Sequence, residues 1–217
     1  MTSMEGVLTS GGMEYPRLTF MQPWADTLSL AGEDQILMTR GDLFPSDLYN
    51  VMYYDKTAQI LAALRGMLGE PTFHRALREY GRRWIGRHPY PYDFFNTVED
   101  VSKQDLGWFW DSWFFEPWPL DQAIASVAKD GPNVAITIED RGLTPMRIDL
   151  AITRADGRTE RMRIPASVWM QGARTHVVRV ARAPEITRVE IDPDGLFPDM
   201  DRSNQLWTTV RGMRAHD

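Results

Sequence analysis

Cysteine is absent from the 217-residue sequence, and histidine is scarce. Without cysteine the chain can form no disulfide and can offer no thiolate to a metal. The four histidines are His74, His88, His176 and His216, and no two of them lie four residues apart. A helix that holds zinc through two imidazoles needs that spacing, because only then do both rings lie on one face. The common helical zinc-binding pattern is therefore missing, and no metal ligand is predicted.

Long apolar runs are also missing, since none approaches the roughly 20 residues that a helix needs to cross a bilayer. No transmembrane segment is therefore predicted. The first residues, MTSMEG, lack the basic and apolar regions of a signal peptide. If the N-terminus is complete, we expect the protein to stay in the cytoplasm. The net charge of −6 argues against nucleic acid or an anionic membrane as a partner.

One basic cluster interrupts this acidic composition. Five arginines fall within a single helical stretch, at positions 75, 78, 82, 83 and 87. They could form a site for phosphate or carboxylate groups, or they could be the solvated face of a helix. In a chain that is acidic overall, the sequence favours the solvated face.

Residues 47–120 have the period of helices. Ile60, Leu61, Leu64, Met67 and Leu68 recur at spacings of three and four before Gly69, which predicts a helix with a glycine C-cap. Pro71 suits the first turn of a second helix, and a third is expected from about Pro91.

A fourth helix carries the strongest pattern in the chain. Ser102 followed by Asp105 is a candidate capping pair for its start. Its aromatic stripe, one leucine followed by four aromatic residues at i, i+3, i+4, i+7 and i+8, consists of Leu106, Phe109, Trp110, Trp113 and Phe114. Such a stripe could be a ligand platform, but a packed helix–helix core is the favoured interpretation.

After Pro117 and Pro119 the period changes to two. Val134, Ile136 and Ile138 alternate with smaller or polar residues, and further strands are expected near 146–152, 159–164, 175–180 and 186–192. Asp130-Gly131 and Asp156-Gly157 are turn signals. This predicts an α+β fold in which a multi-helical portion precedes a small antiparallel β-sandwich. The expected parts are an irregular segment at 1–46, helices at 47–120, the sandwich at 121–200 and a tail at 201–217.

Two short motifs resemble the active-site signatures of the M1 family of zinc aminopeptidases. They are Gly11-Gly12-Met13-Glu14-Tyr15-Pro16 and Tyr54-Asp55-Lys56. The resemblance extends over residues 36–207, and it implies that the helical portion is armadillo-like or like the C-terminal part of thermolysin. It also implies that Gly11, Gly12, Met13 and Glu14 bind the substrate's free amino group and that Tyr54 stabilises the tetrahedral intermediate. Thr57 departs from the family, which usually has glycine there.

The same resemblance implies a zinc ion held by H-E-x-x-H and a further glutamate, between the two motifs. The 39 residues between Glu14 and Tyr54 contain no such segment and are rich in turn residues. We therefore expect no zinc to bind this chain. Without it, nothing in the sequence would generate the attacking hydroxide.

Three functional hypotheses remain open. The first is an M1-type aminopeptidase remnant that is inactive alone, and the second is a non-catalytic module that binds peptides, through the peptide N-terminus, or proteins. The third is a peptidase that takes its zinc ligands from a partner chain. Loss of the zinc helices also predicts exposed apolar surface on the helices at 48–115, where the protein could self-associate.

Overall fold

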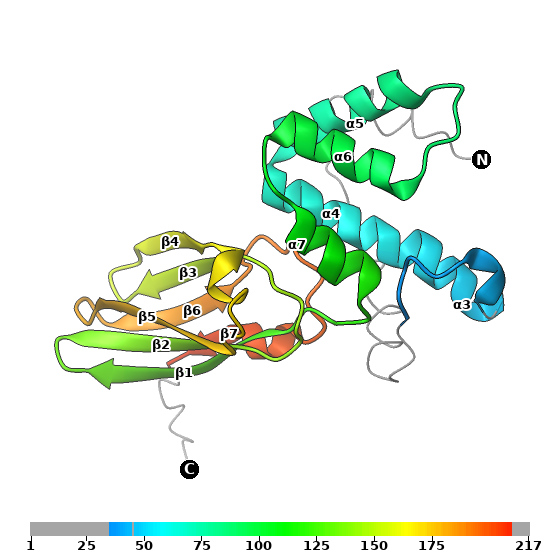
Figure 1. Cartoon of the computed structure of the whole chain (residues 1–217). Coiled ribbons are helices and arrows are strands. Elements are labelled where there is room, and N and C mark those ends of the chain that lie inside the picture. The colour runs from blue at the N-terminus through cyan, green and yellow to red at the C-terminus, as the bar shows by residue number, and fades with distance from the viewer. Residues whose placement is uncertain (1–34, 45, 210–217) are drawn as a thin grey trace, which may run out of the picture.

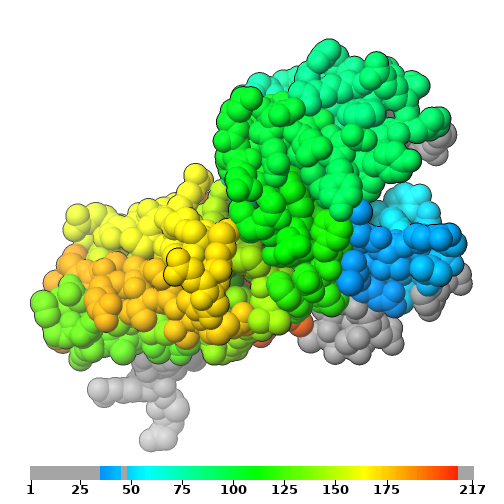
Figure 2. Space-filling view, in the orientation of Figure 1, coloured from blue at the N-terminus to red at the C-terminus, as the bar shows by residue number. Residues whose placement is uncertain are grey.

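The structure, a computed structural model, describes residues 35–44 and 46–209. Helices occupy the first half and two antiparallel sheets the second, so the fold class is α+β as predicted. The halves form two lobes that meet along one boundary (Figures 1 and 2). None of the helices in the described ranges is both long and apolar enough to span a bilayer.

One continuous helix starts the helical lobe and changes its geometry along its length. After the short 3-10 helix η2 (Gly41–Leu43), it runs through α3 (Ser46–Asn50), the π-helical turn η3 (Val51–Lys56) and α4 (Thr57–Leu68). Gly69 ends the helix with a φ of 79°, a conformation that glycine adopts without a steric penalty. The predicted glycine C-cap is therefore confirmed.

The helices α5 (Glu70–Trp84) and α6 (Pro91–Ser102) pack against each other as a pair (Figure 1). Pro71 lies in the first turn of α5 as predicted, where the amide hydrogen that proline lacks would have no helical partner. At the start of α6, the Asp93 carboxylate accepts a hydrogen bond from the backbone N–H of Tyr90 at 2.7 Å.

The last helical segment consists of α7 (Gly107–Trp110) and the π-helical turn η4 (Asp111–Phe115). The prediction that Ser102 helps to cap this segment is wrong. Ser102 is the last residue of α6, which ends at Lys103 in the left-handed conformation. The Asp105 carboxylate alone accepts a hydrogen bond from Gly107 N–H, at 3.1 Å. The α6 end and the α7 start are therefore separated by a loop that the capping pattern did not reveal.

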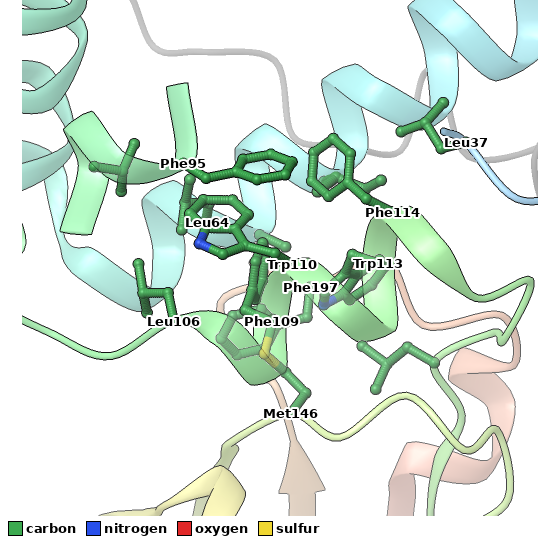
Figure 3. Close-up of a cluster of buried hydrophobic side chains, with 14 of the residues drawn as sticks. Leu37, Leu64, Phe95, Leu106, Phe109, Trp110, Trp113, Phe114, Met146 and Phe197 are labelled. Carbon is green, nitrogen blue, oxygen red and sulfur yellow. The ribbon is translucent and has the colours of Figure 1, made fainter. Parts of the chain in front are cut away.

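The aromatic stripe is buried in the core of the helical lobe, which confirms the core interpretation. Its five members are each at most 8% exposed. Trp110 stacks on Phe95 of α6 with ring centroids 4.5 Å apart (Figure 3). The Glu99 carboxylate accepts hydrogen bonds from Trp110 Nε1 at 3.0 Å and from Leu106 N–H at 3.1 Å. These contacts fix α7 against α6.

The second lobe contains a three-stranded sheet in the order β1-β2-β5 and a four-stranded sheet in the order β4-β3-β6-β7. All strand pairs are antiparallel. The strands are β1 (Gln122–Asp130), β2 (Asn133–Asp140), β3 (Ile148–Arg154), β4 (Thr159–Ile164), β5 (Thr175–Ala181), β6 (Ile186–Ile191) and β7 (Leu206–Thr208). Inward-facing residues of both sheets, such as Ile136, Ile152 and Val178, share one buried cluster.

The sheets continue beyond residue 200, where the sequence predicted a tail. Residues Arg202–Gln205 form the 3-10 helix η6, and β7 then pairs with β6. The Trp207 side chain packs against the sandwich core, and Thr209 N–H donates to the Thr187 carbonyl at 3.1 Å. A strand of three residues is too short for alternation to reveal it, which is why the tail was expected to begin at 201.

The two lobes are joined by shared packing. Leu120, Met146 and Phe197, which flank the strands, belong to the buried cluster of the helical lobe. Figure 3 shows Met146 and Phe197 among the side chains of this cluster. The Arg147 guanidinium donates to the Met67 carbonyl at 2.9 Å and forms a two-point pair with Asp149 at 2.9 and 2.8 Å. It also lies 5.1 Å from the ring centre of Phe197. The boundary is therefore both apolar and hydrogen-bonded.

Candidate functional site

The candidate residues of the Tyr-x-Lys motif all lie in the π-helical turn η3. A π-helical turn is rare in proteins and is frequently found at functional sites. Its wider turn changes which carbonyls find partners, and Thr57 Oγ1 lies 3.4 Å from the carbonyl oxygen of Met52, five residues earlier. The turn presents Tyr53 and Tyr54 in different directions, so the two tyrosines have different surroundings.

Tyr54 is the exposed tyrosine of the pair. Its side chain is 65% exposed, and within the described residues its hydroxyl has no hydrogen-bond partner. A phenol hydroxyl can both donate and accept a hydrogen bond. Tyr54 is therefore free to donate one to a ligand that approaches the surface of the helix at this turn.

Tyr53, in contrast, is occupied by the fold. Its hydroxyl donates to the carbonyl oxygen of Thr39 at 2.5 Å. Its ring meets Phe44 edge-on at 5.4 Å and lies 4.9 Å from the ring of Tyr49. Burial, together with the nearby Tyr49 and Asp42, raises the pKa of Tyr53. These contacts attach the segment before α3 to the helix, which is a structural role.

Lys56 also supports this segment. Its side chain is buried, and Nζ donates to the carbonyl oxygen of Gln35 at 3.3 Å. On the same segment, Leu37 is buried and Met38 N–H donates to the Phe114 carbonyl at 3.0 Å. Residues 35–44 thus pack on the helical core, with Tyr54 beside them on the solvent side of the helix.

The proposed amine-binding residues Gly11, Gly12, Met13 and Glu14 lie outside the described residues. Of the two motifs, the structure describes the one that contains Tyr54.

The described residues offer no donor set for zinc. They contain no group of three or more His, Cys, Asp or Glu side chains placed to hold a metal ion. His74 lies on α5 and pairs with Glu70 at 3.3 Å, whereas His176 lies on β5 against the edge of Trp169. His88 is exposed in the α5–α6 loop. These three histidines come from separate places in the fold, so they do not fit the family's zinc site.

A hollow of about 480 Å³ lies elsewhere, at the boundary of the lobes, and its lining includes Trp108, Asp140 and Arg174. Asp140 is buried, and Oδ2 accepts from Arg174 Nη1 at 3.0 Å. Burial raises the pKa of Asp140 against the opposing effects of Arg174 and of the nearby N–H groups of Gly142 and Leu143. No local sequence pattern could indicate this hollow, because its lining comes from three separate stretches of chain.

Comparison with known proteins finds a family resemblance in the helical part of the chain. Residues 26–113 match the sequence model of the Peptidase family M1 domain. Leucine aminopeptidase 2 of Sclerotinia sclerotiorum is 28% identical over 103 residues, which is 42% of this chain and 17% of that protein. A leukotriene A-4 hydrolase homolog of Botryotinia fuckeliana is 26% identical over 103 residues, which is 42% of this chain and 16% of that protein.

A solved structure resembles most of the chain in fold. The crystal structure of Legionella pneumophila aminopeptidase A in complex with aspartic acid matches with a TM-score of 0.53 and 13% identity. The match covers 84% of this chain and 22% of that protein. The chain thus spans about a sixth of the curated relatives that it matches and about a fifth of this structural neighbour. The part of the chain that contains the helical lobe is therefore similar to a fragment of the Peptidase family M1 domain.

Proposed function

We propose that this chain is an aminopeptidase remnant that retains part of a substrate-binding surface and does not hydrolyse peptides by itself. The observation that carries this proposal is that Tyr54 is available to a ligand while the described residues contain no group that could hold a metal ion. Tyr54 is 65% exposed on a π-helical turn, while the three described histidines lie on separate elements. In addition, no two of the four histidines in the sequence lie four apart.

Tyr54 can supply one part of the chemistry of peptide hydrolysis. A hydrogen bond to the oxygen that gains negative charge in the tetrahedral intermediate can be worth roughly 10²–10³ in rate. That gain requires a nucleophile, and in M1 relatives zinc would supply it by activating a water molecule. Among the described residues no group is placed to hold such a metal ion, so on this proposal the contribution of Tyr54 is limited to binding.

Metal content and turnover test the inactive state directly. The purified chain, incubated with zinc and then dialysed, is expected to contain far less than one zinc per chain by elemental analysis. It is also expected to leave an aminoacyl-arylamide uncleaved. Stoichiometric zinc together with cleavage would overturn the proposal, and cleavage only after addition of a partner chain would favour borrowed ligands.

The alternative function is a non-catalytic module that binds peptides through their N-terminus. It is favoured by Tyr54, whose hydroxyl is exposed, and by Glu14, whose carboxylate could pair with an ammonium group. Calorimetric titration should compare a short peptide with its N-acetylated form. Stronger binding of the free amine, reduced in Glu14→Gln and Tyr54→Phe but not in Tyr92→Phe, would support it. Tyr92 is a suitable control because it is also an exposed tyrosine, at 55%.

We also propose that the segment leading into α4 contacts a second copy of the chain. Ile36, Leu43, Tyr49 and Tyr54 are 40–65% exposed there, and exposed apolar surface of this kind can mark a site of protein–protein contact. Sedimentation velocity should detect a concentration-dependent dimer that Leu43→Ser weakens. A chain that stays monomeric at all concentrations would refute the contact.

A further inference from the structure

The connection between α5 and α6 forms a tip that carries exposed apolar side chains. In Figure 1 this connection lies on the opposite side of the helical lobe from the sheets. Ile85 is 84% exposed, Tyr90 76% and Tyr92 55%. Gly86 makes the turn with a φ of 72°, and no atom outside its chain neighbours lies within 4 Å of the position of a side chain there. The tip therefore projects into solvent and is not covered by other parts of the described chain.

The charge around this tip is opposite to that of the whole protein. Residues 71–92 contain five arginines and a single glutamate, in a chain with a net charge of −6. Arg75, Arg78 and Arg82 are exposed and spaced i, i+3 and i+7, so they lie on one face of α5. That face leads toward the tip, where Arg87 and His88 are also exposed.

Only part of this positive charge is neutralised within the fold. Glu79 accepts hydrogen bonds from Arg82 and Arg83 at 2.7–2.8 Å, and these bonds lower the pKa of Glu79 to about 2. Arg83 also pairs with Asp100 of α6 at 2.7 Å. Within the described part of the chain, Arg75, Arg78 and Arg87 form no ion pair. Three guanidinium groups thus remain available to an anionic partner.

We propose that the α5–α6 tip, with the exposed arginine face of α5, docks on the surface of a membrane that contains anionic lipid. Arginines bind lipid phosphates through paired hydrogen bonds, and tyrosines favour the headgroup level. An exposed isoleucine between them can enter the boundary between headgroups and acyl chains. A membrane fits a projecting apolar tip better than a protein does, because a protein partner must supply a matching concavity. The proposal does not depend on the peptidase ancestry.

The net charge of −6 by itself argues against binding to an anionic membrane. The uneven distribution of the charges, however, affects the orientation in which the protein docks. The anionic surface attracts the arginine face and repels the more acidic remainder of the protein. Because the attraction reaches only about one Debye length, the local cluster governs binding and the distant acidic groups contribute little. Docking is therefore expected with the tip toward the lipid.

Vesicle co-sedimentation of the full chain tests this docking. We expect the chain to pellet with phosphatidylcholine vesicles that contain phosphatidylglycerol, and not with phosphatidylcholine alone. High salt should weaken the binding. The double variant Arg78→Ala with Arg87→Ala should lower the partition coefficient by about fivefold for each arginine removed. Ile85→Ser should lower it several-fold without changing the charge.

The matched control is the double variant Arg163→Ala with Arg179→Ala. These arginines lie on the strands, with side chains 76% and 61% exposed, and their removal changes the net charge equally. It should leave binding unchanged, and circular dichroism checks that every variant is folded. The docking is refuted if the chain binds neutral vesicles equally well, binds no vesicle at low salt, or loses no more affinity in the tip variants than in the control. Binding of an acidic protein in place of vesicles would refute it as well.

Discussion

The guanidinium of Arg147, just before β3, donates a hydrogen bond of 2.9 Å to the backbone carbonyl of Met67 in the last turn of α4. The carbonyls of the last turn of a helix lack helical partners, so this bond satisfies one of them from the other lobe. The same guanidinium neutralises Asp149, whose side chain is only 11% exposed. One side chain therefore joins the two lobes and balances a buried charge.

Replacing Arg147 with Met should destabilise the protein by about 3–5 kcal/mol, because it leaves the carboxylate of Asp149 buried with only Arg163, at 3.7 Å, nearby. Urea unfolding followed by circular dichroism measures the change. The control Arg163→Met removes a side chain that is 76% exposed and should cost less than about 1 kcal/mol. Equal losses in the two variants would show that the contacts of Arg147 contribute no special stability.

Gly142→Ala should be strongly destabilising, because a Cβ atom there would lie 2.3 Å from the Pro119 carbonyl oxygen and 2.5 Å from Asp121 N. Both are backbone atoms, so relief requires the segments to move apart, at a cost of about 1–3 kcal/mol or more. The control is Gly81→Ala on α5, where nothing lies within 4 Å. That change should stabilise the helix by about 0.5–1 kcal/mol. Thermal unfolding of both variants measures the contrast, and a tolerated Gly142→Ala would contradict the close approach.

The two neighbouring tyrosines should respond differently to loss of the hydroxyl. Tyr53→Phe removes the bond to the Thr39 carbonyl and should cost about 1 kcal/mol of unfolding free energy. Tyr54→Phe removes an exposed hydroxyl and should change stability by less than about 0.5 kcal/mol. The same urea experiment distinguishes them. A larger loss for Tyr54 than for Tyr53 would mean that their structural roles are reversed.

Asp199 makes stability depend on pH near neutrality. Burial raises its pKa from 3.8 to about 7, although the N–H groups of Gln122 and Asp201 favour the charged form. Because the folded pKa is the higher one, the folded state retains a proton that the unfolded state releases. The contribution to stability is fully present below about pH 4 and is lost as the pH rises through about 7, at up to about 1.4 kcal/mol per pH unit.

Comparing the wild type with Asp199→Asn over this range isolates the effect. The amide cannot ionise, but it has one acceptor oxygen for the two backbone N–H groups, so the variant should be less stable at pH 4. As the pH rises to 8, the difference should shrink or reverse in favour of the variant. A difference in unfolding free energy that is independent of pH would rule out this assignment.

The sequence predicted best those elements whose residues alternate between buried and exposed with a clear period. The stripe from Leu106 to Phe114 and the strand with Val134, Ile136 and Ile138 were both predicted, because each buries one face. Strand β1 was not predicted, because its residues after Ala123 are no longer buried and do not alternate between buried and exposed. As an edge strand it is held mainly by backbone pairing with β2. Backbone hydrogen bonds leave no trace in the pattern of side chains, so the sequence does not reveal them.

Part of the candidate site could be predicted only through its motif. The Tyr-x-Lys motif points to Tyr54, and the structure shows that its neighbour Tyr53 is less exposed. Both tyrosines lie in the π-helical turn, which neither the composition nor the hydrophobic period of the sequence could predict. The link from Arg147 to Met67 spans 80 residues and depends on how the lobes meet, so no local pattern could show it.

The packing of Leu120, Met146 and Phe197 in the helical core has a consequence for how the protein can be divided. A cleavage after residue 120 would take two of these three side chains away with the sheets and leave the aromatic stripe open to water. Neither piece would then be a complete folding unit, and each would expose the apolar surface that it buries against the other in the intact chain. Fragments cut at this point are therefore expected to recombine when mixed, which would make the junction a natural place to split the chain into a complementing pair.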